Sequence, residues 1–122
     1  MYEKIESFSC QTSIEGEKYV YKYFLLQSIK KVSMENDEID VQCYGIEIQR
    51  ERIIADRVVD TYSENIKYMS PQKNKVLGLL NLLKDYEVSP IHLVDVTGDS
   101  VDEWVEDFDY VTSNNQKRAL FV

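Results

Sequence analysis

The apolar residues of this chain change their spacing once, at Ser70-Pro71, and this change constrains the fold more than any other feature. Before it, apolar and aromatic residues come in dense or alternating runs that are typical of strands. After it, they recur at helical spacing. Serine is a preferred N-cap and proline fits the first helical position, so we expect a helix to begin here. The sequence therefore predicts an α+β fold, with strands first and helices last.

The N-terminal part predicts an antiparallel sheet of about four strands. Residues 2–14 end at Glu15-Gly16, where glycine can supply the positive φ of a tight hairpin. The aromatic run Lys18–Ile29 is typical of a central strand that is covered on both sides. Val41–Glu51 alternates like a half-buried strand with one solvent-exposed face, and Ile53–Tyr62 is its expected partner. Because no Gly, Pro or Asn marks the turn between these two strands, their register stays open.

The C-terminal part predicts two or three helices that pack on the sheet. The apolar stripe of the first helix consists of Val76, Leu79, Leu80 and Leu83. Gly78 lies within this helix, and a close approach of helix and sheet would explain it. Ser89-Pro90 repeats the start signal and indicates a short helical turn. We expect Gly98 to break this turn and Ser100–Glu103 to form the capping box of a last helix.

The last helix is expected to be amphipathic. Its apolar stripe consists of Val101, Trp104, Val105 and Phe108, and acidic residues line the opposite face. Ser113–Gln116 is expected to end it. The chain is then one domain, residues 1–112, followed by a C-terminal tail, residues 113–122. The apolar end of this tail, Ala119–Val122, would allow it to dock on the core.

The acidic charge of the chain is concentrated at this helical end. The formal net charge is −8, and residues 85–122 hold 9 acidic but only 2 basic side chains. The candidate partner-binding residues are Asp99, Asp102, Glu103, Glu106 and Asp107. An acidic helix face without a catalytic set favours a non-enzymatic binding or regulatory module. Its expected partner is a protein with a basic surface, since complementary charges speed encounter.

An enzyme is the alternative function, and it would use His92 with a nearby carboxylate. His92 is the only histidine, so any histidine-based mechanism must use this one residue. Neither the spacing of a triad nor a nucleophile turn supports such a mechanism, and we assign no catalytic residue. Asp95–Glu106 has acids at four positions of a calcium loop, but Thr97 and Ser100 depart from that pattern. We therefore expect neither a metal nor a cofactor.

Nucleic acid and membrane are disfavoured as partners. An aromatic and basic run, Lys18–Phe24, could stack on bases, but a net charge of −8 repels phosphate. Apolar stretches are far shorter than the roughly 20 residues of a membrane helix, and no secretory signal is seen, so we expect a cytoplasmic protein. Cys10 and Cys43 match no metal-ligand spacing and are expected to be core residues rather than a disulfide. A homo-oligomer is compatible with the sequence.

Two segments carry a resemblance. Tyr44–Ile48 (YGIEI) and Val88–Val96 (VSPIHLVDV) resemble a family of small clostridial proteins that has no assigned activity. The resemblance covers roughly Val41 to Phe108. It implies a bacterial cytoplasmic protein and supplies no catalytic residues. In such proteins a short acidic helix follows directly, whereas Thr97–Ser100 is expected to interrupt it here.

Overall fold

The computed structural model describes residues 2–121, with the side chains of residues 2–33 and 35–108. Four strands come first: β1 (Tyr2–Ile14), β2 (Glu17–Met34), β3 (Asp37–Ile54) and β4 (Arg57–Ser70). The helices follow: α1 (Lys73–Asp85), the short 3₁₀ helix η1 (Pro90–His92) and α2 (Leu93–Phe121). The predicted α+β fold, a four-stranded antiparallel sheet followed by C-terminal helices, is confirmed.

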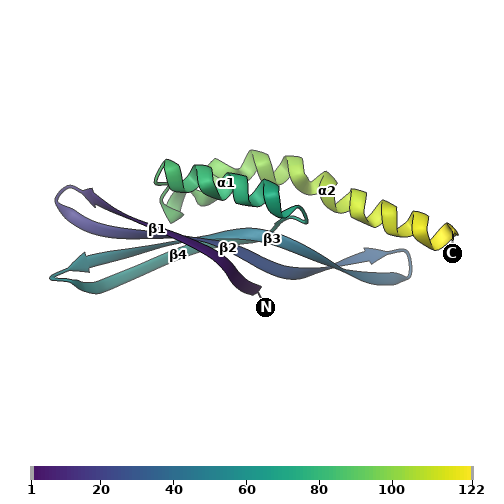
Figure 1. Cartoon of the computed structure of the whole chain (residues 1–122), viewed down its shortest axis with the longest axis horizontal. Coiled ribbons are helices and arrows are strands. Elements are labelled where there is room, and N and C mark those ends of the chain that lie inside the picture. The colour runs from purple at the N-terminus through teal and green to yellow at the C-terminus, as the bar shows by residue number, and fades with distance from the viewer. Residues whose placement is uncertain (1, 122) are drawn as a thin grey trace.

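The sheet is a meander in the order β1-β2-β3-β4, and every neighbouring pair is antiparallel (Figure 1). The turn from β1 to β2 is the predicted one, with φ of 51° at Glu15 and 82° at Gly16. The turn from β3 to β4 consists of Ala55 and Asp56, with φ of 52° and 62°. The prediction that β4 starts at Ile53 is wrong, because β3 runs to Ile54. Two non-glycine residues with positive φ form this hairpin turn, which no Gly, Pro or Asn marks.

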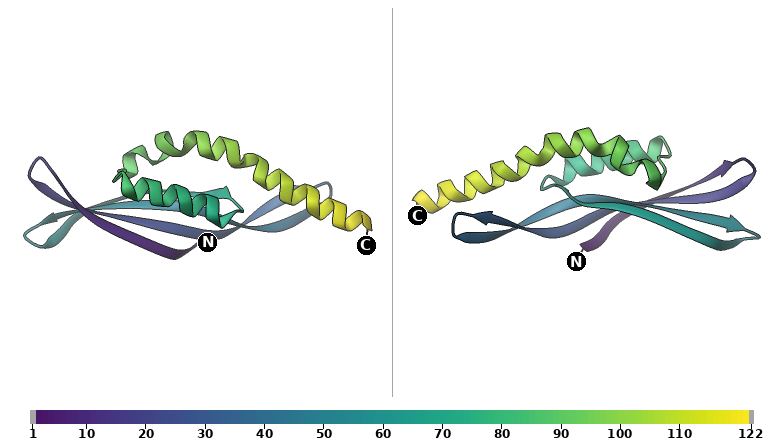
Figure 2. Two further views of the ribbon diagram at one scale, coloured as in Figure 1. Left: turned by 45° about the horizontal axis from the view of Figure 1, so that its top comes forward. Right: turned by 180° about the vertical axis from the view of Figure 1, so that it is seen from behind.

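Both helices lie on one side of the sheet (Figures 1 and 2). The main hydrophobic core lies between the sheet and these helices. It contains Tyr21, Tyr23 and Leu25 of β2, Ile46 and Ile48 of β3, Met69 of β4, Val76, Leu80 and Leu83 of α1, and Leu93 of α2. Leu26 and Ser28 of β2 alternate with these residues and are buried as well, so the prediction that β2 is covered on both sides is confirmed for this part of the strand.

Long side chains of β1 take the place of a helix over part of the open face. Glu47 of β3 is only 5% exposed. Its carboxylate accepts a hydrogen bond from the Tyr2 hydroxyl at 2.9 Å and pairs with Lys4 Nζ at 3.0 Å. Lys4 Nζ also lies 4.1 Å from the centre of the Phe24 ring. At Glu47, the face of β3 that is turned away from the helices is therefore less exposed to solvent than the alternating sequence predicts.

The β2–β3 hairpin extends beyond its neighbours. Within the described residues, β1 pairs with β2 only as far as Ser28, and β4 pairs with β3 only as far as Tyr44. The remaining hairpin has two strands, and two-stranded ribbons twist more strongly than wide sheets. Figure 1 shows this twist under the C-terminal half of α2. As a result Val41 and Cys43, which alternate with the residues facing α1, pack against Phe108 of α2.

Both cysteines are free thiols, as predicted. Cys43 is fully buried and Cys10 is partly buried. Burial raises the pKa of the Cys43 thiol, since the uncharged form is favoured away from water. Cys43 is therefore a core residue and lies in the second, smaller cluster with Phe108.

The start of α1 differs from the prediction by two residues. Ser70 ends β4, and α1 begins at Lys73 with Gln72 as its N-cap. The Ser70 hydroxyl still accepts the Gln72 backbone N–H at 3.0 Å. The close approach expected at Gly78 is also wrong, because a Cβ built there meets nothing within 4 Å.

α2 is one continuous helix. The predicted break at Gly98, the capping box at Ser100 and the end at Ser113–Gln116 are all wrong, because helix runs through them to Phe121. A single helical glycine costs only about 1 kcal/mol, and burial of Leu93 and Phe108 on either side of Gly98 offsets this. The predicted docking of Ala119–Val122 concerns side chains outside the described ones.

Candidate interaction surface

One face of α2 is fixed by packing on the sheet. Leu93 and Thr97 are fully buried, and Phe108 is 8% exposed. The Thr97 hydroxyl donates a 2.5 Å hydrogen bond to the Leu93 carbonyl, so this buried polar group has a partner within the helix. Val101 and Trp104 pack against the main core from the same face. The rotation of α2 about its axis is therefore set by these contacts.

Five acidic residues of α2 lie on the opposite face. They are Asp95, Asp99, Asp102, Glu103 and Glu106, and all are exposed. At about 100° per residue they fall within about 100° of the helix circumference. Among the described residues none of them forms an ion pair, whereas other acidic side chains, such as Glu47 and Glu51, do. We call these five residues the acidic stripe.

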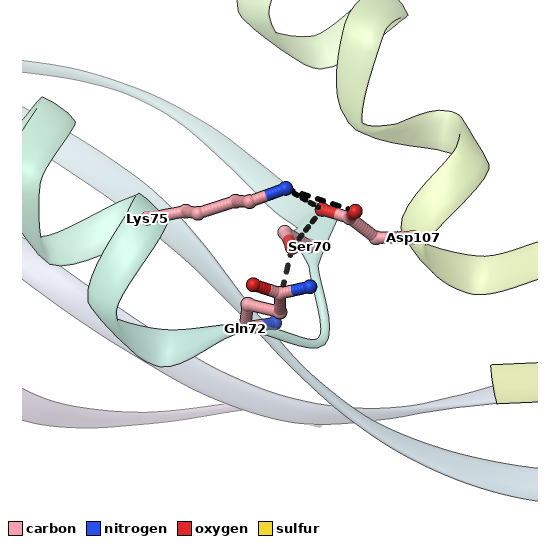
Figure 3. A network of polar contacts seen from close by, with 4 residues as sticks. All are labelled: Ser70, Gln72, Lys75 and Asp107. Atoms are coloured by element: carbon pink, nitrogen blue, oxygen red, sulfur yellow. Dashed lines mark hydrogen bonds and ion pairs between the residues drawn. The ribbon is translucent and has the colours of Figure 1, made fainter. Parts of the chain in front are cut away.

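Asp107, which the sequence grouped with these acids, lies apart from them. Its side chain is 13% exposed and points towards the start of α1 (Figure 3). The carboxylate accepts hydrogen bonds from the Ser70 hydroxyl at 2.8 Å and from Lys75 Nζ at 2.9 Å. Asp107 therefore joins α2 to the junction between β4 and α1, while the other four predicted residues face outward.

A groove lies beside α2, on the side towards the twisted β2–β3 hairpin. Its volume is about 310 Å³. Its apolar lining consists of Val32, Tyr68, Met69, Val101, Val105 and Phe108, and Lys30 and Lys31 contribute from β2. We call it the hairpin groove. Sequence reasoning missed it, because it depends on how far the hairpin twists and on where α2 crosses it.

His92 stands at the end of η1 and is exposed. Its backbone N–H donates to the Ser89 carbonyl at 3.0 Å, which closes the helical turn. The part of the chain with described side chains holds no group of three or more His, Cys, Asp or Glu that could bind a metal ion. The segment Asp95–Glu106 is helical throughout, so it is not a calcium loop.

The aromatic run of β2 belongs to the core. Tyr21 and Tyr23 are buried, with their rings edge to face at 6.4 Å between centroids. The Tyr23 hydroxyl donates to the Val88 carbonyl at 3.0 Å, and burial raises its pKa. These rings cannot stack on bases while the fold is intact.

A family model described as a family of unknown function (DUF6514) matches residues 2–103. The match covers the whole sheet, α1, η1 and the first part of α2. Four acids of the acidic stripe lie within it, and Glu106 lies beyond it. Comparisons with curated proteins and with solved structures find no significant match. Among the described residues, no helix combines the length and apolarity needed to cross a bilayer.

Proposed function

Because the chain belongs to the family of unknown function DUF6514, we propose its role from its own surface. It is a non-enzymatic binding or regulatory module. Its acidic stripe engages a basic surface on a partner protein. It acts in the cytoplasm, where unpaired thiols such as Cys10 and Cys43 persist.

The observation that carries this proposal is the unpaired charge of the stripe. Five carboxylates share one exposed helix face and repel each other across i, i+3 and i+4 spacings, which costs stability. A basic partner relieves this repulsion and gains from long-range attraction. Asp107 does not take part, because Ser70 and Lys75 already occupy its oxygens.

The test compares two variants with the same change in charge. In the stripe variant, all five acids of the acidic stripe are replaced by lysine. In the matched control, five exposed acids of the sheet and its turns are replaced in the same way: Glu3, Glu15, Glu35, Glu38 and Asp60. Each protein is immobilised, and binders from its native cytoplasm are captured at about 0.05 M and about 0.5 M salt, where screening differs severalfold.

We expect the wild type and the matched control to capture basic proteins at low salt and to release them at high salt. The stripe variant should not capture them. A His92→Ala variant should capture them as the wild type does. If the stripe variant retains the same binders, or if salt has no effect on capture, the proposal is wrong.

A further inference from the structure

We infer that the hairpin groove takes apolar side chains of the partner, so that the partner presents an amphipathic basic segment. This inference rests on the proposed function and names the chemistry of the partner. The acidic stripe alone would accept any basic surface. The groove beside it selects a segment whose basic row is flanked by an apolar row.

The groove and the stripe share one helix. Val101 precedes Asp102 directly, and Val105 precedes Glu106, so each of these two groove residues has a carboxylate next to it. Val94, Val101 and Val105 follow each other at i, i+7 and i+11, which places them along one side of the stripe. Val94 is 61% exposed and Val105 is 53% exposed. Gly98 stands between Val94 and Val101 in this row and adds no side chain that would hold a partner away.

The bottom of the groove is shielded from water, whereas its edge along α2 is exposed to solvent. Met69 of β4 and Phe108 of α2 both line it and are buried. A volume of about 310 Å³ has room for apolar side chains of a partner. Removing such side chains and the exposed valines from water would add affinity that salt does not weaken.

The far wall of the groove limits the orientation of the partner. Lys30 Nζ lies 4.5 Å from the centre of the Phe108 ring and 5.9 Å from that of Tyr68. Together with Lys31 it makes the hairpin wall positive, opposite the negative stripe. A segment that is basic all round would be repelled by this wall. The partner therefore carries its cations along one side only, facing α2.

A second copy of this chain is a poorer occupant. It would bring a net charge of −8 and its own acidic stripe towards the stripe of the first copy. Like charges placed across an interface oppose association. The charge of the surface thus favours a basic partner over self-association.

Two synthetic peptides test the inference, each about 16 residues long, so that as a helix of roughly 24 Å it covers the roughly 18 Å that residues 94–106 span. The amphipathic peptide carries leucines at helical spacing on one face and lysines beside them. The polar peptide has the same lysines, with serine in place of every leucine. Binding of each is measured by fluorescence anisotropy at low and high salt. The proteins are wild type, Val105→Ser and the control Val96→Ser, whose side chain is 51% exposed but does not line the groove.

We expect the wild type to bind both peptides at low salt, and the amphipathic one at least about tenfold tighter, which corresponds to about 1.4 kcal/mol. The amphipathic peptide alone should stay bound at high salt. Val105→Ser should lose most of this preference and leave binding of the polar peptide unchanged, while Val96→Ser should behave as wild type. Val105→Thr, of nearly the same shape, replaces the serine variant if circular dichroism shows that the latter is unfolded.

The outcomes separate the inference from the proposed function. If neither peptide binds at low salt, the proposed function fails, and the inference fails with it. If both bind equally, the stripe is a charge-only surface and the groove inference alone is wrong. If the amphipathic peptide gains nothing while the wild type dimerises and Val105→Ser stays monomeric by sedimentation, the groove belongs to a second copy and the inference is overturned.

Discussion

Two glycines show how differently one residue type can act in this fold. Gly45 of β3 lies against the backbone of β4, where the register shifts between Tyr44 and Ile46. A Cβ there would lie far inside van der Waals contact with the Ile66 carbonyl oxygen, and 2.5 Å from that of Lys67. At Gly78 the same atom meets nothing within 4 Å. Only Gly45 is required by a close approach of two backbones.

Alanine at these two positions should therefore shift stability in opposite directions. Gly45→Ala forces two strands apart and should cost about 3 kcal/mol or more. Gly78→Ala removes a helix-interior glycine and should add about 1 kcal/mol. Urea unfolding of both variants measures the free energies. A loss of stability in Gly78→Ala, or a Gly45→Ala protein as stable as wild type, would contradict the geometry.

At the scale of elements, one polar cluster fastens α2 to the rest of the fold. The Asp107 carboxylate accepts hydrogen bonds from both Ser70 and Lys75 (Figure 3), but the two donor residues differ in solvent exposure. Ser70 is fully buried, whereas the Lys75 side chain is 39% exposed. Buried hydrogen bonds to a charged group are worth more than exposed ion pairs, which water and salt weaken. The Ser70 contact should dominate.

Asp107→Ala should therefore destabilise the protein by about 2 kcal/mol, because the Ser70 hydroxyl loses its charged acceptor. Lys75→Ala should cost less than about 1 kcal/mol, and high salt should not increase that loss. Thermal unfolding in low and high salt distinguishes the two. Equal losses in both variants would show that the ion pair, and not the hydrogen bond to Ser70, holds α2.

The sequence is a better guide to which strands and helices form than to where they meet in the fold. The change of spacing at Ser70-Pro71 separates strands from helices correctly, because hydrophobic periodicity is local. The turn at Ala55-Asp56 could not be placed, since alanine is not typical of positive φ and Asp56 alone, without Gly, Pro or Asn beside it, does not fix a turn. The continuity of α2 through Gly98 depends on burial of Leu93 and Phe108, which no local signal reports. The exposed acids of α2 were predicted, but the groove beside them arises only from the packed fold.

At the scale of the whole molecule, α2 bridges two apolar clusters. Its first turns pack through Leu93 on the main core, with α1 and the centre of the sheet. Further along, Phe108 packs on Val41 and Cys43 of the extended hairpin. In the described chain, the part of the β2–β3 hairpin beyond Ser28 and Tyr44 has no neighbouring strand. Its folded conformation therefore depends on the contact with Phe108. Opening of the hairpin should therefore be separable from unfolding of the core.

Hydrogen exchange on Phe108→Ala tests this division. Losing a buried aromatic ring costs about 3 kcal/mol where the site cannot collapse, and here the loss falls on a two-stranded ribbon. Amides of residues 30–41 should exchange more than about tenfold faster, while those of Tyr23–Leu25 keep most of their protection. Leu80→Ala leaves a cavity in the main core instead and should lower protection in both regions. The main core anchors α2, and α2 in turn holds the hairpin, so unfolding of the core also exposes the hairpin. If Phe108→Ala lowers protection equally everywhere, sheet, helices and hairpin unfold as one unit, and α2 then transmits the loss of any contact to the whole molecule.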